Sequence, residues 1–471
     1  MNPTTKNKIT VIGAGLAGCE AAWQIARRGI DVELIEMKPV RFSPAHHSEG
    51  FAELICSNSL KAARVESAAG LLKEEMRRMG SLLMACADRC RVDAGGALAV
   101  DRDLFSAAVT QAIRENPHIE VVCREANEIP RDGITVVASG PLTDGALAED
   151  IRSLCGDGLS FFDAAAPIVT AESIDRTICF AASRYDKGGD DAYLNCPMNK
   201  DEYTAFYQAL VGAERAPVHG FDVQNPKVYE GCMPVEVMAG RGEDTLRFGP
   251  LKPVGLRDPR TGHRPWAVVQ LRMENSAGTL YNMVGFQTNL KWGEQKRVFR
   301  MIPGLQNAEF MRYGVMHRNT FLDSPRLLDL DFSLRSHPQI FFAGQMTGVE
   351  GYMESGDSGL MAGINAARRL QGKPPVVLPE VTMTGALCRH VAESPTDNFQ
   401  PMGANLGVLP PLAEHIRDKK QRYAALSQRA LEALQICLPE LLAGRVDHMK
   451  SLKSRAAAVL HSFPNFSGQA F

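Results

Sequence analysis

A glycine-rich turn near the N-terminus constrains the fold of this chain more than any other feature. The apolar run Ile9–Ile12 leads into the turn Gly13–Gly18, and a helical stretch follows over Cys19–Arg28. A second apolar run, Val32–Ile35, comes next. Strand, tight turn, helix and strand in this order predict a βαβ unit with parallel strands and a right-handed crossover.

The turn and the residues around it have the chemistry of a dinucleotide site. Gly13 permits the sharp turn, Gly15 lets the backbone approach a pyrophosphate, and Gly18 lets the helix pack closely on the strand. The positive end of the helix then faces the phosphates. A carboxylate at the end of the second strand would accept hydrogen bonds from a ribose hydroxyl. The predicted cofactor-binding residues here are Gly13, Ala14, Gly15, Leu16, Ala17, Gly18 and Glu36.

A late strand favours FAD over NAD as the dinucleotide. Ile340–Gly344 is an apolar run that is followed by further glycines and by a helical stretch over Ser358–Leu370. In the large FAD-binding family that carries an inserted domain, such a strand returns to cover the ribityl and isoalloxazine portion of the cofactor. This adds Gly344 and Gln345 to the predicted cofactor site. We interpret Gly356–Gly359 as a turn and helix cap.

The pattern along the chain predicts an α/β fold, a Rossmann-like FAD-binding domain of the glutathione-reductase type with an inserted α+β domain. Apolar runs become shorter, and Pro, Gly and Arg more frequent, between about 179 and 321. We expect a first part of the FAD-binding domain over 1–178, an insert facing RNA or substrate over 179–321, a return segment over 322–372 and a mainly helical region over 373–471. Further helices are expected over Ala62–Met79, Asp101–Arg114 and Leu412–Leu442.

Composition excludes several classes of protein. The 471 residues carry a formal net charge of -2, so no global charge points to nucleic acid or to a membrane surface. No run of about 18 apolar residues is present and no secretory leader is recognisable, so we expect a cytoplasmic protein without a membrane partner. Eleven irregularly spaced cysteines indicate reduced thiols. Cys86 and Cys90 lack a second ligand pair, so no metal site is expected.

Four segments carry a more specific resemblance. They are His46–His47, Phe51–Leu60 (FAELICSNSL), Glu230–Glu236 (EGCMPVE) and Gly344–Tyr352 (GQMTGVEGY). With them, nearly the whole chain resembles the bacterial folate- and FAD-dependent tRNA uracil-5-methyltransferase family. The resemblance implies methylation at C5 of the T-loop uridine of tRNA. It also implies 5,10-methylenetetrahydrofolate as carbon donor, FAD, and NADH or NADPH as reductant, with no role for DNA.

The same resemblance implicates two cysteines, Cys56 and Cys232. Uracil C5 is a poor nucleophile, so a thiolate must first add to C6, and a base must later remove the C5 proton. We assign Cys232 as the nucleophile and Cys56 as the base or activating thiol, with the reverse assignment left open. Either thiol needs nearby positive charge to ionise, for which His46 or His47 is a candidate. We expect the two cysteines to face one another across the flavin, in a cleft between the FAD-binding domain and the insert.

A local basic surface is required if RNA is the substrate. Residues 239–300 contain 11 Lys and Arg against 5 Asp and Glu. The aromatics Phe248, Trp266, Phe286 and Trp292 lie among them and suit stacking on unpaired bases. The residues leave three alternatives open: the same chemistry on ribosomal RNA, modification of a tRNA wobble uridine, or a non-catalytic flavin redox or RNA-binding protein.

Overall fold

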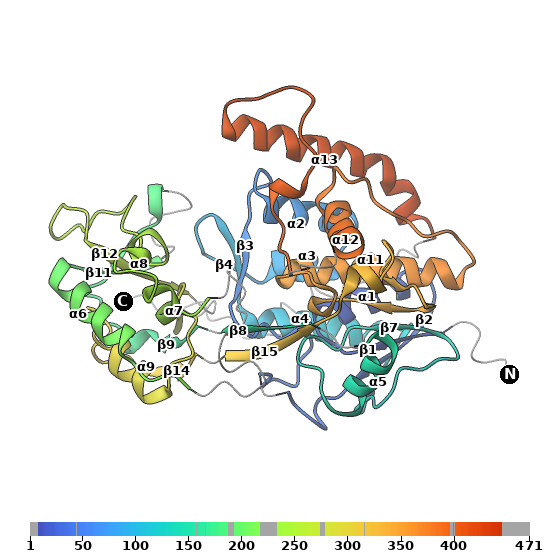
Figure 1. Ribbon diagram of the computed structural model, residues 1–471, viewed down its shortest axis with the longest axis horizontal. Coiled ribbons are helices and arrows are strands. Elements are labelled where there is room, and N and C mark those ends of the chain that lie inside the picture. Colours follow the sequence, from blue (N-terminus) through green and yellow to red (C-terminus); the bar gives the residue numbers. More distant parts are fainter. Residues whose placement is uncertain are drawn as a thin grey trace, which may run out of the picture.

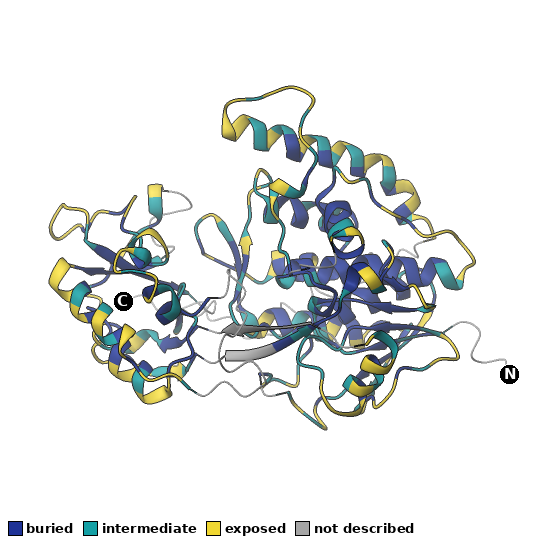
Figure 2. Ribbon diagram, viewed as in Figure 1, coloured by how far each residue is buried: buried dark blue, intermediate teal, exposed yellow. Residues whose placement is uncertain are grey.

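The computed structural model describes residues 8–43, 45–156, 159–164, 166–186, 193–216, 233–273, 278–314, 316–395, 399 and 401–444. Cys232 lies outside these residues. The prediction that Cys232 faces Cys56 across the flavin therefore also falls outside the described part of the chain. Two bodies are visible in Figure 1: a larger one around helices α1 and α11, and a smaller one that contains α6, α7, α8 and α9. Figure 2 shows that each body has its own buried interior.

A six-stranded sheet forms the centre of the larger body. Its strand order is β16-β17-β7-β1-β2-β6, and only β16 runs antiparallel to its neighbour. The parallel pairing of β1 with β2 around helix α1 confirms the predicted βαβ unit. The strands are β1 (Lys8–Ile12), β2 (Asp31–Glu36), β6 (Ile119–Cys123), β7 (Ile134–Val137), β16 (Ser333–Leu334) and β17 (His337–Phe342). The chain therefore returns to this sheet about 200 residues after β7, as the late apolar run predicted.

Helices α1 (Leu16–Ala26) and α11 (Tyr352–Leu370) pack against one another at very close range. A Cβ on Gly359 would lie 2.2 Å from the carbonyl oxygen of Ala17, so only glycine fits there. The interpretation of Gly356–Gly359 as a turn and helix cap is wrong, because α11 already begins at Tyr352. These small residues form the face of a helix that contacts its neighbours directly.

The remaining helices of the larger body cover the sheet or extend beyond it. Two buried carboxylates bind the N-terminal ends of α3 and α12: Glu20 accepts from the Leu82 and Leu83 N–H groups, and Glu75 from those of Met383 and Thr384. The helices are α2 (Ala68–Arg78), α3 (Leu82–Arg89), α4 (Arg102–Arg114), α5 (Gly145–Cys155), α10 (Ser324–Leu327), α12 (Met383–Glu393) and α13 (Lys419–Leu442).

Two predicted helices begin later than expected, each because a side chain caps the helix. Ser67 accepts from the Gly70 N–H and starts α2 six residues after the predicted Ala62, which belongs instead to a strand. Asp418 accepts from the Gln421 N–H and starts α13 at Lys419. That strand is part of a three-stranded sheet ordered β3-β5-β4, with β3 (Ser59–Ala62), β4 (Arg91–Val92) and β5 (Ala97–Val100).

A buried lysine on α2 makes stability depend on pH. Lys73 is fully buried, and its Nζ donates to the Leu60 carbonyl at 2.7 Å. Burial, partly offset by Glu354, lowers the pKa of Lys73 from 10.5 to about 7. Between these values the folded chain binds fewer protons than the unfolded chain, so this group makes the free energy of unfolding rise with pH.

We expect the Tm advantage of a Lys73→Met variant over the wild type to be largest below pH 7. It should shrink as the pH approaches 9, because the wild type is then released from the cost of burying a charge. Thermal melts in one buffer series measure it. Lys420→Met, at an exposed position, is the control and should show a constant difference. A Lys73→Met difference that grows with pH would contradict the expectation.

The smaller body is built on a second six-stranded sheet, ordered β10-β11-β12-β13-β9-β14. Its strands are β9 (Ile168–Thr170), β10 (Phe180–Ala181), β11 (Tyr193–Met198), β12 (Ala267–Met273), β13 (Leu280–Met283) and β14 (Phe310–Arg312). Its helices are α6 (Lys200–Val211), α7 (Val235–Ala239), α8 (Thr245–Phe248) and α9 (Trp292–Phe299). Because β9 pairs with β13 and β14, we propose that the insert begins near residue 166 and not at 179.

A two-stranded ribbon joins the two bodies. Strand β8 (Leu159–Ala164) leaves the larger body and pairs antiparallel with β15 (Met316–Phe321), which returns to it. The insert is therefore entered and left through adjacent strands (Figure 1). Among the described residues, no helix is both long and apolar enough to cross a membrane.

Candidate functional site

A cavity of about 480 Å³ lies along the carboxyl edge of the first sheet. The residues that follow five of its strands line the wall: Arg124 after β6, Glu36 at the end of β2, Gly13 after β1, Ser139 after β7 and Gly344 after β17. The sheet order places these five positions one after another. The cavity is therefore elongated across the sheet, as an extended dinucleotide requires.

The glycine turn has the geometry that its sequence predicted. Gly13 has φ of +98°, and a Cβ there would lie 2.6 Å from the Ala138 carbonyl oxygen. A Cβ on Gly18 would lie 1.8 Å from the Gly13 carbonyl oxygen, so the helix can approach the turn only without a side chain. Beside Gly15, in contrast, a Cβ would meet nothing within 4 Å. The open space at Gly15 is where a pyrophosphate can approach the backbone.

Gly15, Leu16 and Ala17 line the cavity at the N-terminus of α1, and no side chain caps this helix. Its first N–H groups therefore keep their capacity to bind phosphate oxygens. Gly18 is buried beneath the turn and is not part of the lining. The turn thus divides into residues that contact the cavity and a residue that supports them.

Glu36 is buried and holds the turn as well as lining the cavity. Its carboxylate accepts from the Ala14 N–H at 2.6 Å and from the Lys38 N–H at 3.0 Å. A carboxylate has about four lone-pair sites, so two remain for ribose hydroxyls. The predicted ribose contact is compatible with this geometry, and the bond to Ala14 is a second role that the sequence did not indicate.

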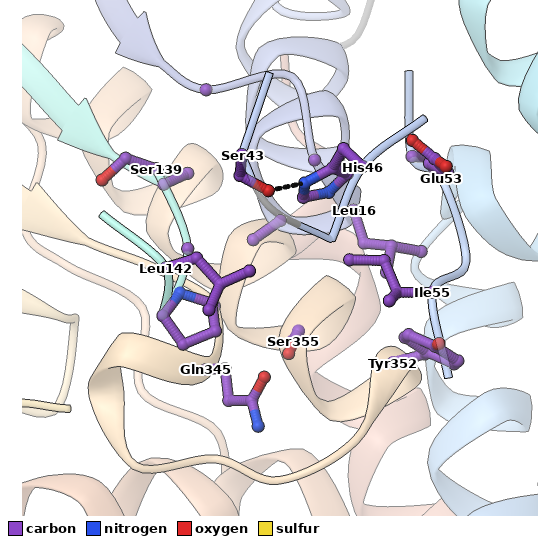
Figure 3. A pocket seen from close by; sticks show the side chains of 18 of the residues that line it. Leu16, Ser43, His46, Glu53, Ile55, Ser139, Leu142, Gln345, Tyr352 and Ser355 are labelled. Carbon is purple, nitrogen blue, oxygen red and sulfur yellow. Dashed lines mark hydrogen bonds between the residues drawn. The ribbon is translucent and has the colours of Figure 1, made fainter. Parts of the chain in front are cut away.

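The far end of the cavity is formed by the residues after β17 and by the start of α11. The Gly344 N–H donates to Ser358 Oγ at 2.7 Å, and Gln345 Nε2 donates to Glu350 Oε2 at 2.8 Å. Tyr352 and Ser355 line the same end, and no side chain caps α11. A second helix N-terminus therefore favours negative charge on a bound group. Figure 3 shows Gln345, Ser355 and Tyr352 arranged around this part of the cavity.

Cys56 lies in the wall of this cavity, beside Tyr352. The Tyr352 hydroxyl oxygen accepts from the Cys56 N–H at 2.7 Å and from the Ser57 N–H at 3.3 Å, and it lies 2.9 Å from Cys56 Sγ. Because its two lone pairs face these N–H groups, we infer that the hydroxyl proton is directed at the sulfur. Burial, together with Cys56, raises the pKa of Tyr352 well above its usual range, so the hydroxyl stays protonated. This geometry stabilises a thiolate at Cys56.

The histidines do not supply the positive charge that was suggested for the thiolate. His46 lines the cavity, and its Nδ1 lies 2.6 Å from Ser43 Oγ. Figure 3 marks this hydrogen bond with a dashed line. Burial lowers the pKa of His46, which keeps the imidazole neutral at pH 7. His47 is exposed and outside the lining. Lys61, in the same wall as Cys56, is a cation whose Nζ lies 2.7 Å from Glu354 Oε1.

The insert is fastened to the segment that carries Cys56. Arg272, buried at the end of β12, donates from Nη2 to Ser57 Oγ at 2.7 Å and from Nε to Asn58 Oδ1 at 3.0 Å. Asn58 Nδ2 donates back to the Met273 carbonyl at 2.9 Å. Sequence reasoning missed Arg272, although a charged residue at the end of the apolar run Val268–Leu271 was a signal. Between residues 166 and 321, the described part of the chain contributes Gln287 and Asn319 to the lining of the cavity.

Comparison with known proteins places this site in a family. A family model described as "Glucose inhibited division protein A" matches residues 8–374. A relative from Acetivibrio thermocellus, named "Methylenetetrahydrofolate--tRNA-(uracil-5-)-methyltransferase TrmFO", is 61% identical over 428 residues, which cover 91% of this chain and 98% of the relative. The chain belongs to the TrmFO family. A TrmFO relative from Desulfitobacterium hafniense is 62% identical and covers 91% of this chain and 97% of the relative.

Solved structures agree with the fold. The chain is similar to Aquifex aeolicus GidA in its form II crystal, with a TM-score of 0.67, 15% identity, and coverage of 98% of this chain and 77% of that one. The predicted resemblance to the TrmFO family and the predicted fold class are thus confirmed. The roles of individual site residues rest on the geometry described above.

The residues present fit FAD. Along the sheet edge, Glu36 with its free lone pairs comes first, at the end of β2. The open space beside Gly15 and the uncapped N-terminus of α1 follow after β1, and the uncapped N-terminus of α11 lies at the far end. This is the order of a ribose, a pyrophosphate and a ring. Ile55 and Leu16 add apolar surface to the wall (Figure 3). FAD is thus the cofactor of this family that the cavity suits.

Proposed function

We propose that this protein transfers a one-carbon unit from 5,10-methylenetetrahydrofolate to C5 of the T-loop uridine of tRNA, giving 5-methyluridine. The observation that carries the proposal is the place of Cys56, whose thiol lies in the wall of the same cavity as the glycine turn and is held by Tyr352. Relatives that are 61% and 62% identical are named as methylenetetrahydrofolate-dependent tRNA (uracil-5-)-methyltransferases. Because its substrate is tRNA, the proposed location is the cytoplasm.

The cavity residues would hold FAD by three groups of contacts. Glu36 would bind the adenosine ribose, Gly13–Gly18 and the N-terminus of α1 the pyrophosphate, and Gly344–Gln345 with the N-terminus of α11 the ring. When bound, FAD supplies the electrons that reduce the transferred carbon to a methyl group, with NADH or NADPH as the source of reducing equivalents. The protein contributes orientation and a wall that excludes water.

The cysteines would perform the addition and the proton transfer on uracil. In our assignment the Cys232 thiolate forms a bond to C6, and C5 then bonds to the methylene carbon as one of its bonds to folate nitrogen breaks. Cys56 accepts the C5 proton as its thiolate becomes a thiol, and the electron pair of that C–H bond expels tetrahydrofolate from the methylene. A hydride equivalent, which reduced FAD would supply, completes the methyl group and expels Cys232 from C6 as its thiolate. The Tyr352 hydroxyl prepares Cys56 by donating to the sulfur before the proton arrives. The reverse assignment of the two cysteines uses the same geometry.

The alternatives differ in the RNA substrate or in whether the protein is an enzyme. Ribosomal RNA would need the same residues, a wobble uridine would use a related cofactor set, and a non-catalytic flavoprotein would not need a thiol in the cavity. The names of the relatives favour tRNA and uracil C5. The insert, with its local excess of Lys and Arg, is the proposed RNA-facing part.

One assay tests the proposal. The full chain with FAD, NADH or NADPH and folate labelled in the methylene group is offered tRNA transcripts with and without the T-loop uridine, and a ribosomal RNA transcript. We expect label in tRNA only when that uridine is present. Label from S-adenosylmethionine, or label in ribosomal RNA alone, would overturn the proposal.

Variants separate the cysteines in the same assay. We expect Cys56→Ala and Cys232→Ala to lose label transfer, while Cys123→Ala, an exposed cysteine outside the cavity, keeps it. Full activity of Cys232→Ala would remove the nucleophile assignment and leave the flavin site standing.

A further inference from the structure

A chain of aromatic rings runs from the interior of the insert to its surface. Phe299 is fully buried, and its ring packs edge to face with Phe286 at 5.3 Å between centroids. Phe310 follows at 6.5 Å. Tyr313 stacks on Phe310 at 5.3 Å, and Trp292 stacks on Tyr313 at 5.5 Å with only 12° between the ring planes. We call Phe310, Tyr313 and Trp292 the aromatic ladder.

The outermost ring of the ladder is open to solvent. Trp292 is 63% exposed although its indole stacks on Tyr313, so the opposite face of the indole is available. An exposed tryptophan is costly to hydrate, and a partner that covers the free face would release that cost. A ring fixed on one face and open on the other is the arrangement that accepts a further planar group.

The ladder is held rigidly by a buried glutamine. Gln295 of α9 is fully buried, and its Nε2 donates to the Gly314 carbonyl at 2.8 Å and to the Leu290 carbonyl at 2.7 Å. Its Oε1 accepts from the Gly314 N–H at 2.8 Å. These bonds join the two segments that carry Trp292 and Tyr313. The stacking surface is thus formed before any partner arrives, which lowers the entropy cost of binding.

The charge around the ladder identifies the class of partner. Residues 291–300 contain four Lys and Arg against one Glu. Lys291 at the N-cap of α9, and Lys296 and Arg297 on the helix, are exposed near Trp292 in the sequence. Lys291 forms an ion pair with Glu214, and Arg297 forms one with Glu294. A cationic helix with an exposed, stacked tryptophan suits a polyanion that has unpaired planar bases. Lysines are depleted at protein–protein interfaces, so the lysines beside Trp292 favour a polyanion over a protein as the partner.

The residues of the aromatic ladder are also close in sequence to residues that line the cavity. Gln287, which lines the cavity, precedes Trp292 by five residues, so their Cα atoms are at most about 18 Å apart. Asn319, another lining residue, follows Tyr313 by six residues. Both segments of the ladder therefore continue into the cavity wall on the side of the insert.

We infer that Trp292 stacks on an unpaired base of the RNA substrate, outside the flavin cavity, and so positions the loop whose uridine enters it. This inference rests on the proposed function and adds a second, separate base contact to it. The neighbouring cations of α9 hold the phosphates of the same loop.

Binding of labelled tRNA transcript to the full chain with FAD, measured by fluorescence anisotropy over a series of salt concentrations, tests the inference. Loss of one base–aromatic stack corresponds to about 1–3 kcal/mol, so Trp292→Ala should weaken binding by roughly 10- to 100-fold. The slope against salt should stay unchanged, because no phosphate contact is lost. Trp292→Phe should recover most of the affinity. A Lys296→Ala, Arg297→Ala double variant should reduce the slope instead.

Ile436→Ala is the control, because Ile436 is a large apolar residue that is exposed on α13, outside the insert. It should bind tRNA as the wild type does. Wild-type affinity in Trp292→Ala, an equal loss in Ile436→Ala, or a change of Trp292→Ala in oligomeric state with tRNA binding intact would overturn the inference. If the wild type methylates tRNA and Trp292→Ala binds it normally, the ladder inference alone fails. If the wild type neither binds nor methylates tRNA, the proposed function fails as well.

Discussion

A Gly15→Val variant is expected to fold like the wild type but to purify without FAD. Gly15 has an ordinary φ of −72°, and a Cβ there meets nothing within 4 Å, so a side chain can begin at this position without a clash inside the protein. The new side chain would occupy the space beside the N-terminus of α1, where the pyrophosphate must approach the backbone. We expect FAD affinity to fall by more than about 100-fold, since steric exclusion also removes the N–H contacts. The flavin absorbance of the purified protein measures its FAD content, and a thermal melt measures whether the variant is folded like the wild type.

Gly18→Ala is the informative contrast. Its Cβ would lie 1.8 Å from the Gly13 carbonyl oxygen, so this smaller change must displace the turn or the helix. We expect Gly18→Ala to lower the Tm or prevent folding, in line with the cost of overpacking, whereas Gly15→Val does not. Normal FAD content in Gly15→Val would mean that the pyrophosphate does not pass over Gly15.

A Tyr352→Phe variant is expected to keep FAD and lose most of its methyl transfer. The substitution removes the donor to Cys56 Sγ and the acceptor for the Cys56 and Ser57 N–H groups, while the ring remains in place. A hydrogen bond to a charged group contributes about 1.5–3 kcal/mol, so alkylation of Cys56 by iodoacetamide at pH 7.5 should slow by roughly 10- to 100-fold. Peptide mapping after timed alkylation reports the rate at Cys56.

The alkylation of Cys123 provides the internal reference, because this exposed cysteine lies outside the cavity. Its rate should be the same in both proteins. If Cys56 reacts in Tyr352→Phe as fast as in the wild type, the hydroxyl does not stabilise the thiolate. A parallel loss of FAD would instead assign Tyr352 to the shape of the cavity.

The parts of the fold that sequence predicted well are those fixed by neighbouring residues. The turn Gly13–Gly18 is explained by nearby atoms, because Gly13 is required by the Ala138 carbonyl oxygen after the adjacent strand and Gly18 by the Gly13 carbonyl oxygen. The start of α11 was misplaced for the opposite reason. Gly356 and Gly359 resemble turn residues when read locally, yet they are small because Leu83 and Ala17 lie against them. A contact between distant segments cannot be seen in a local pattern.

The candidate site shows the same division. The motif context singled out Cys56, but its hydrogen bond to Tyr352 joins residues 296 positions apart. The bonds of Arg272 to Ser57 and Asn58 cross from one body to the other. Among the predicted stacking aromatics, Phe286 is fully buried and Trp266 lies under Arg247, at 3.7 Å from the guanidinium carbon to the ring centroid, whereas Phe248 and Trp292 are exposed. Composition identified the aromatic residues, and only packing decides which of them reach the surface.

The pairing of β8 with β15 changes what the insert means for the rest of the chain. The antiparallel pairing of β8 and β15 brings together the two ends of the insert, as the strands of a hairpin bring together the ends of its loop. Loop-closure entropy rises only slowly with the number of residues enclosed, and an enclosed segment with its own hydrophobic core supplies its own order. The length and sequence of the insert can therefore change in evolution with little cost to the folding of the nucleotide-binding sheet. The fixed requirement is at the contact surface, where Arg272 must still reach the segment that carries the reactive thiol.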